Sequence, residues 1–298
     1  GIFGAGTIGT AITTFGAPLL ISVLDWRETV QIYAAVLAFT AVVFYLLTRE
    51  DPASIARALG TLKPRKLVDQ LLPLMRLQVW RFSLYYFFVF GAFVALAGWL
   101  PRYYMGMYGL TLTEAGMLTT AYALPAAAFR AFGGWISDRM GARTVMYLTF
   151  IVSSVICFIL SYPATEYIVQ GIRGPINFSF AIGLRPFVAL TIVLGFFMAI
   201  GMAAVYKHIP VYYPDNVGAV GGLVGAIGGL GGFFLPIAFG VMNDTVGVWT
   251  SSFMLLFVLV TAALIWMHGA IRLMERHRIG ALKGLPELPE MAELHNKN

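Results

Sequence analysis

The strongest constraint on the fold is a series of long, mostly apolar stretches that follow one another along the chain. A helix needs about 20 apolar residues to cross the hydrocarbon core of a bilayer. Eight stretches approach this length, at residues 3–24, 29–48, 82–100, 115–136, 144–162, 186–206, 217–242 and 247–270. Backbone polar groups in lipid must be satisfied within their own segment, so each stretch is expected to be a helix. The sequence therefore predicts an all-α, polytopic membrane protein.

The composition supports lipid as the surrounding medium. Hydrophobic residues make up 59% of the chain and charged residues 11%, whereas soluble domains carry roughly 25% charged residues. The net charge is +6, but the basic residues lie in the short segments between the apolar stretches. This pattern is typical of membrane topology and gives no support to nucleic-acid binding. The single cysteine, Cys157, lies in an apolar stretch and is expected to fill the core.

The basic segment 49–81 divides the chain, with two apolar stretches before it and six after it. Its density of Lys and Arg predicts a cytoplasmic location. Alternating from there places the segment 137–143, the region of Lys207 and His208, and the tail in the cytoplasm. The predicted parts are the last two helices of an N-terminal half (1–48), a cytoplasmic inter-half loop (49–81), a six-helix C-terminal half (82–270) and a cytoplasmic tail (271–298). On this count, four further spans precede residue 1, and the chain holds spans 5–12 of twelve.

One charged side chain lies deep inside an apolar stretch. Arg130 is the only charged residue well within any of the eight stretches. An arginine near the middle of a membrane costs about 2.5 kcal/mol or more, and such residues usually face a cavity or a partner. Its planar, always charged guanidinium suits a small planar oxyanion held by two parallel hydrogen bonds. None of the stretches contains an acidic residue, so Arg130 is predicted to bind an anion. A structural pair with a carboxylate from outside the stretches is the alternative.

Glycines recur at spacings of four in the stretch 217–242, as in Gly221, Gly225 and Gly229. Small residues at this spacing let helix backbones approach closely. Helix packing alone accounts for the pattern. The further hypothesis is that the glycine helices rock and bring backbone dipoles near a bound ion, with Gly225 and Gly229 at the substrate.

Aromatic residues line the stretch 82–100, where Tyr86, Phe90 and Phe93 share one face at helical spacing. They could wall a substrate cavity, with the Tyr86 hydroxyl hydrogen-bonded to an anion. Lipid contact is the alternative for the phenylalanines.

No pattern in the sequence indicates an enzyme. The four histidines lie at the ends of the stretches or in the tail and form no metal-binding pattern. No nucleophile is paired with a base, and no phosphate-binding loop is present. The chain is therefore expected to have no enzymatic activity, metal or cofactor, and no feature indicates an obligate protein partner.

The segment between two stretches at 134–143 reads Gly-Trp-Ile-Ser-Asp-Arg-Met-Gly-Ala-Arg. It fits a tight turn between two helices, with an aspartate near a helix end that can pair with basic neighbours. It resembles the cytoplasmic loop motif of the major facilitator superfamily, G-x-x-x-D-R-x-G followed by basic residues, and departs from it at Ala142. The resemblance implies a major facilitator fold. The motif residues are Gly134, Asp138, Arg139, Gly141 and Arg143.

Other segments resemble the nitrate/nitrite porters, the NarK-like family of that superfamily. Residues 218–240 are similar to the second nitrate signature of the family, residues 1–18 to the first, and residues 84–93 to the seventh span. Arg130 before Gly133-Gly134-Trp135 matches the family's substrate-binding arginine. The resemblance implies that Arg130 binds nitrate or nitrite, that Tyr86 hydrogen-bonds the anion and that Phe90 packs on it. The first signature usually carries Asn where this chain has Thr7, which can still hydrogen-bond the substrate.

The resemblance implies secondary active transport of nitrate and nitrite, in nitrate assimilation, across a bacterial-type cytoplasmic (inner) membrane. The C-terminus is expected in the cytoplasm, and the mechanism is alternating access between two halves. Both nitrate/nitrite antiport and nitrate/proton symport stay open. The stretches offer no acidic residue for protons, whereas the start Gly-Ile-Phe-Gly-Ala-Gly resembles the branch thought to be proton-coupled. Another small anion, such as a carboxylate, is the alternative substrate. A non-transporting membrane sensor is the alternative from another class.

Overall fold

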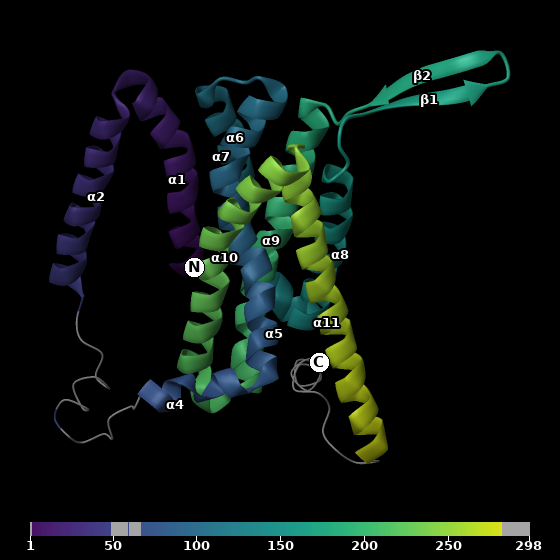
Figure 1. The fold of residues 1–298 in the computed structure, drawn as a ribbon. Coiled ribbons are helices and arrows are strands. Elements are labelled where there is room, and N and C mark those ends of the chain that lie inside the picture. Colours follow the sequence, from purple (N-terminus) through teal and green to yellow (C-terminus); the bar gives the residue numbers. More distant parts are fainter. Residues whose placement is uncertain (1, 49–58, 60–66, 282–298) are drawn as a thin grey trace.

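The computed structural model describes residues 2–48, 59 and 67–281. Most of these residues lie in long helices packed side by side (Figure 1). The long helices are α1 (Ile2–Val23), α2 (Trp26–Leu47), α5 (Leu77–Tyr86), α6 (Phe93–Tyr108), α7 (Leu112–Met140), α8 (Ala142–Leu160), α9 (Leu184–Tyr212), α10 (Val217–Val246) and α11 (Ser251–Ala281). Shorter helical elements are α4 (Leu67–Leu71), η1 (Leu72–Met75), η2 (Phe87–Ala92) and η3 (Pro214–Asn216). The prediction of a helix at each of the eight apolar stretches is confirmed.

Six helices of the described part are long and apolar enough to cross a membrane. They are α2, the continuous segment Leu77–Tyr108, α8, α9, α10 and α11 up to Arg276. Two of the predicted spans, α1 and α7, are not among these six, although they are helices of 22 and 29 residues. Several α1 side chains lie outside the described residues. In α7, charged residues such as Glu114 and Arg130 lower the mean hydropathy.

Two predicted boundaries fall inside helices. Helix α5 begins at Leu77 rather than at 82, and it contains Arg81, which is buried. Helix α9 continues to Tyr212, so Lys207 and His208 are helical rather than part of a loop. The aromatic ring of Phe82 stacks on the buried His208 at 5.7 Å between ring centroids. Polar residues at a helix end lower the local hydropathy without ending the helix, which explains both errors.

About half of the predicted loop 49–81 and more than half of the predicted tail 271–298 lie outside the described residues. Of the loop, α4, η1 and the start of α5 are described, and of the tail only the last turns of α11. The division of the chain into two halves therefore stays a prediction.

The third apolar stretch contains a π-helical turn. Segment η2 joins α5 to α6 without a break, so that the three form one element. Single π-turns inside α-helices frequently occur at functional sites. Gly91 lies in this turn, and a Cβ atom at that position would stand 2.6 Å from the carbonyl oxygen of Gly228 in α10. The absence of side chains here lets the two backbones meet.

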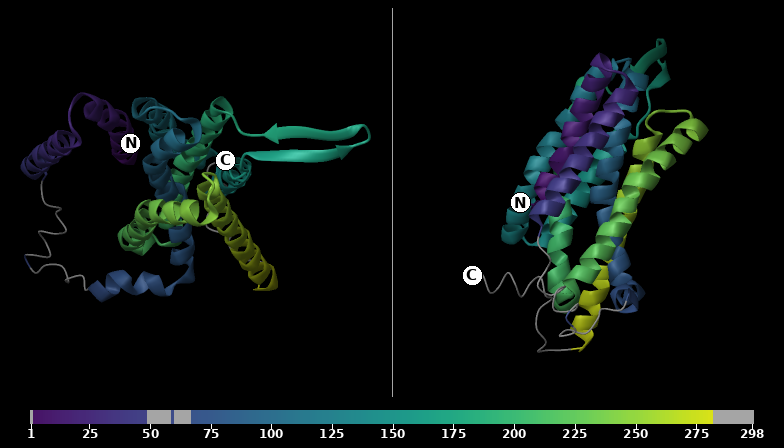
Figure 2. Two further views of the ribbon diagram at one scale, coloured as in Figure 1. Left: turned by 45° about the horizontal axis from the view of Figure 1, so that its top comes forward. Right: turned by 90° about the vertical axis from the view of Figure 1, so that its left-hand side faces the viewer.

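A two-stranded hairpin is the one described element that is not helical. Strands β1 (Thr165–Gly171) and β2 (Gly174–Phe180) pair antiparallel between α8 and α9. The hairpin projects sideways from the bundle, on the side away from α1 and α2 (Figures 1 and 2). The sequence analysis did not anticipate it.

The core lies between the helices after the predicted loop. Buried aromatic rings of α6, α9 and α11 meet there, and Tyr103 stacks on Phe187 at 4.7 Å between centroids. Cys157 is fully buried, as predicted for a core residue. This packing fixes α6 and α9 and, through them, the adjoining elements that carry the site.

Candidate functional site

Arg130 extends from α7 into a cluster of aromatic side chains and is 7% exposed. Its Nη2 atom donates a hydrogen bond to the Tyr86 hydroxyl over 3.0 Å. The guanidinium carbon stands 5.8 Å from the centroid of the Phe90 ring, within the range of a cation–π contact. A hydroxyl and an aromatic face therefore orient the guanidinium, and both of these groups are neutral.

The rings of Tyr86 and Phe90 stack at 5.0 Å between centroids, with 15° between their planes. Tyr86 is the last residue of α5, and Phe90 lies in the π-turn η2. Phe93, expected on the same face, instead stacks on Tyr122 at 5.0 Å. The wider π-turn rotates Phe93 away from the face that carries Tyr86. The structure thus brings together Arg130, Tyr86 and Phe90, three of the predicted site residues.

Tyr206 of α9 joins this cluster, and the sequence analysis missed it. Its ring meets the Tyr86 ring edge-on at 5.0 Å, with 89° between the planes. Its hydroxyl donates a hydrogen bond to the Gly221 carbonyl oxygen of α10 over 3.3 Å. The sequence feature that could have indicated this position is a tyrosine as the last residue of the apolar stretch 186–206. We call Arg130, Tyr86, Phe90 and Tyr206 together the anion cluster, after the anion that the sequence predicts Arg130 to bind.

Helix α10 approaches the anion cluster along its glycines. A Cβ atom at Gly225 would stand 2.7 Å from the Tyr206 hydroxyl, and one at Gly228 would stand 2.4 Å from Cδ1 of Tyr86. Both distances are too short for a real side chain. At Gly229 a Cβ atom would be 4.0 Å from the Phe90 ring, which is an ordinary contact. Close approach therefore requires glycine at Gly228, which the sequence analysis did not single out, because Tyr86 backbone and Cβ atoms also lie within 3.0 Å. At Gly225 the close atom is the end of the Tyr206 side chain, which can shift.

Two further expectations concern ligands. The side chain of Thr7 lies outside the described residues. Within the described part of the chain, no group of three His, Cys, Asp or Glu side chains could hold a metal ion.

The motif residues lie at the junction of α7 and α8, where Gly141 separates the helices with a φ of 80°. Asp138 forms an ion pair with Lys207 of α9, whose ammonium also donates to the Ser137 carbonyl oxygen over 3.2 Å. The basic partner of Asp138 therefore comes from a distant part of the sequence. Arg139 lies over the Trp135 ring at 4.2 Å, and a Cβ atom at Gly134 would meet no atom within 4 Å.

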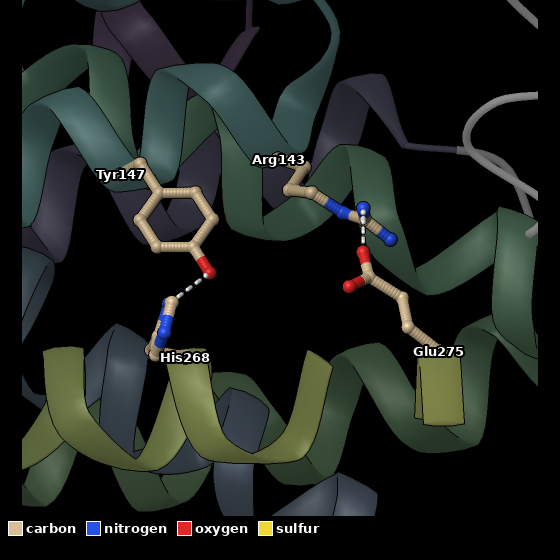
Figure 3. A network of polar contacts seen from close by, with 4 residues as sticks. All are labelled: Arg143, Tyr147, His268 and Glu275. Carbon is tan, nitrogen blue, oxygen red and sulfur yellow. Dashed lines mark hydrogen bonds and ion pairs between the residues drawn. The ribbon is translucent and has the colours of Figure 1, made fainter. Parts of the chain in front are cut away.

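A second polar cluster joins α8 to α11 (Figure 3). Arg143, the last motif residue, donates to the carboxylate of Glu275 over 3.4 Å. One turn further along α8, the hydroxyl of Tyr147 is hydrogen-bonded to Nδ1 of His268 over 3.1 Å. We call these four residues the α8–α11 cluster. Here the arginine charge is matched by a carboxylate, which indicates a structural role.

Long apolar helices around a buried arginine define a polytopic membrane protein with a polar site between its helices. The chain belongs to the Major Facilitator Superfamily, because a sequence model of that family matches residues 1–165 and also residues 104–291.

Several curated relatives are similar to this chain. A protein of Thermus thermophilus named "Probable nitrate/nitrite antiporter NarK1" is 41% identical over 90% of this chain and 62% of its own length. The "Nitrite extrusion protein" of Bacillus subtilis is 32% identical over 90% of this chain and 62% of its own length. "Probable nitrate/nitrite transporter NarK2" of Mycobacterium tuberculosis is 33% identical over 83% of this chain and 57% of its own length. The chain thus spans about three fifths of the length of these relatives.

Proposed function

We propose that the protein transports nitrate and nitrite across the cytoplasmic membrane, and that the anion cluster forms one side of the substrate site. The contact between Arg130 Nη2 and Tyr86 Oη, 3.0 Å long, carries this proposal. The names of the relatives, which refer to nitrate and nitrite, support the choice of anion.

The chemistry of the anion cluster suits a small planar oxyanion. A guanidinium has five N–H donors in a fixed planar arrangement, and Nη2 of Arg130 donates to the Tyr86 hydroxyl. Donors on one edge of the guanidinium can hold two oxygens of nitrate side by side. The Phe90 ring provides a flat apolar surface beside the guanidinium. The Tyr86 hydroxyl accepts from Arg130 with a lone pair, so it can donate its own proton to a substrate oxygen.

Alternating access is the mechanism that this packing supports. Helix α10 contacts both η2 and Tyr206 through its glycine residues rather than through interlocking side chains. Interfaces between small residues let helices come close and shift against each other with little steric resistance. In transporters of this kind, two halves rock around a midplane site. Arg130 then holds the anion from the C-terminal half, while the other half closes over it.

We also propose that the α7–α8 junction faces the cytoplasm. The pair Asp138–Lys207 places the end of α9 beside this junction, and the pair Arg143–Glu275 places α11 there. The basic residues at this end include Arg139, Arg272 and Arg276. Lys and Arg concentrate on the cytoplasmic side of membrane proteins. The C-terminus of α11 then lies in the cytoplasm, which a reporter fused there would test.

The test of this function is nitrate uptake by the full-length protein in liposomes loaded with nitrite. Uptake is followed with and without a proton gradient, in the wild type, in Arg130→Lys and in Arg102→Lys as a control for the loss of a guanidinium elsewhere. We expect nitrate uptake in the wild type and in Arg102→Lys, and strongly reduced uptake in Arg130→Lys.

The proton gradient and the internal nitrite separate the two coupling schemes. Uptake that needs internal nitrite and ignores the gradient establishes exchange. Uptake that follows the gradient without internal nitrite establishes symport with protons. The absence of nitrate movement under every condition would overturn the proposed substrate.

A further inference from the structure

The hairpin between α8 and α9 has two chemically different faces. Its register pairs Tyr167 with Phe178, and Val169 with Ile176. Because side chains alternate across a strand, these four residues share one face, together with Thr165 and Phe180. The opposite face carries Glu166, Gln170, Asn177 and Ser179, with Ile168 as its one large apolar residue. We call the first of these the apolar hairpin face.

The apolar hairpin face is open in the described structure. Ile176, Phe178 and Phe180 are each about half exposed, and Ile172 at the tip is fully exposed. The rings of Tyr167 and Phe178 stack across the strands at 5.5 Å, which gives the face a flat aromatic surface. A lone two-stranded hairpin is marginally stable in water. An apolar surface of this kind marks an interaction site.

The apolar hairpin face continues a surface of α8 that faces outward. Leu148, Ile151, Val155 and Phe158 follow one another at helical spacing and are all exposed. Where this stripe ends, Phe158, Ile159 and Tyr162 line a largely apolar recess of about 370 Å³ together with Tyr167, Phe178, Ser179 and Phe180. The rings of Tyr162 and Phe180 meet edge-on at 5.2 Å. The lipid-facing side of a membrane-spanning helix thus leads directly into the recess.

We propose that the hairpin lies on the surface of the bilayer with its apolar face toward the lipid, and that acyl chains fill the recess beside α8. The hairpin leaves the bundle across the direction of the helices, as a segment that lies on a membrane surface does (Figures 1 and 2). Its charged residues, Glu166 and Arg173, lie on the opposite face and in the turn, within reach of water and headgroups. Aromatic side chains favour the interface between lipid and water.

Other occupants of this surface do not explain its continuity with α8. A second copy of the chain would also have to cover the exposed stripe of α8. In the membrane, lipid already covers that stripe. The proposal holds for either orientation of the protein in the membrane and is independent of the substrate.

Single fluorescent labels on the two hairpin faces test this proposal. The full-length protein, with Cys157→Ala and any other cysteine replaced, receives Val169→Cys or Ile176→Cys on the apolar face. Gln170→Cys and Asn177→Cys are the matched controls, since each lies one residue away on the opposite face. All four residues are exposed, so the substitutions leave the helical bundle unaltered. Each labelled variant is reconstituted in phosphatidylcholine vesicles and exposed to brominated acyl chains or to aqueous iodide.

We expect brominated lipid to quench the labels at 169 and 176, and iodide to quench those at 170 and 177. Quenching of all four labels by iodide and of none by lipid would overturn the proposal, because the hairpin would then stand clear of the bilayer. Protection of 169 and 176 from both quenchers would also overturn it and would identify a protein as the occupant.

Discussion

Two arginines, Arg130 and Arg143, lie in different surroundings. Arg143, near the start of α8, contacts the carboxylate of Glu275, which compensates its charge. Arg130, deep in α7, donates to the phenol of Tyr86 and lies beside the Phe90 ring, and both of these groups are neutral. Ion pairing suits a fixed contact between helices. Under the proposed function, orientation by neutral groups suits an arginine that binds an anion, so the two arginines are expected to differ in their effect on transport.

The largest expected effect is that of Arg130→Lys on transport. Lysine keeps the charge but cannot present two parallel donors. The loss of a hydrogen bond to a charged partner costs about 1.5–3 kcal/mol, which corresponds to roughly a 10- to 100-fold weaker affinity for nitrate. Arg143→Lys provides the comparison and should retain transport, because a lysine can still pair with Glu275. Equal losses in the two variants would break the distinction between the two arginines.

Tyr86→Phe should reduce nitrate affinity by about tenfold, since it removes one hydrogen-bonding group of the anion cluster. The neighbouring Tyr85→Phe is a matched control. The Tyr85 hydroxyl is buried and has no hydrogen-bond partner among the described residues, so its removal should leave affinity unchanged. Competition by nitrate for uptake of a labelled anion measures both variants. A loss of affinity in Tyr85→Phe as large as that in Tyr86→Phe would contradict the proposed role of Tyr86.

Gly228→Ala should destabilise the protein, because its Cβ atom would overlap Cδ1 of Tyr86. Overpacking of this kind costs about 1–3 kcal/mol. Gly222→Ala on the same helix meets no atom within 4 Å, and its effect should stay within about 0.5 kcal/mol. Thermal unfolding of the two purified variants gives the comparison. Equal stability would show that α10 does not approach the anion cluster as closely as described.

Tyr206→Phe should weaken the attachment of α9 to α10 without removing the ring that supports Tyr86. The lost hydrogen bond to Gly221 is worth about 0.5–1.5 kcal/mol. We expect a small decrease in thermal stability and a changed transport rate, with nitrate affinity preserved. A large decrease in affinity would instead place the Tyr206 hydroxyl in contact with the substrate.

Glu275→Gln should have the smallest effect. Ion pairs that are partly open to solvent contribute about 0.2–1 kcal/mol, and the Glu275 side chain is 38% exposed. Thermal stability should decrease slightly, and nitrate uptake should not change. A marked loss of uptake would show that the α8–α11 cluster takes part in transport, and the contrast with Arg130 would then fail.

The helices and the proximity of Arg130, Tyr86 and Phe90 could be predicted because each rests on a strong local signal. Apolar stretches of the length of a membrane specify helices whatever their packing. A single arginine within such a stretch is costly enough to indicate function, and Tyr86 and Phe90 follow from helical spacing. The resemblance to a family supported their assignment to one site.

Other features depend on packing that no local pattern reveals. The π-turn at Phe87–Ala92 is coupled to the close contact of Gly91 with Gly228, two positions far apart in the sequence. Tyr206 lies beside Tyr86 only because α9 packs against α5 in the folded protein. The hairpin did have a local signal, since Tyr167, Val169, Ile176 and Phe178 alternate with mostly polar residues, apart from Ile168, around a Gly-Ile-Arg-Gly turn. Alternation of this kind is typical of strands. It does not form a long apolar stretch, which is the pattern that predicts the helices.

The most direct test of the central claim is the binding of nitrate to the purified full-length protein, measured by calorimetry in the wild type, Arg130→Lys and Arg143→Lys. We predict that the wild type and Arg143→Lys bind nitrate with similar affinity and that Arg130→Lys binds it at least about tenfold more weakly. Unchanged binding by a folded Arg130→Lys variant would contradict the account, because the anion would then be held elsewhere.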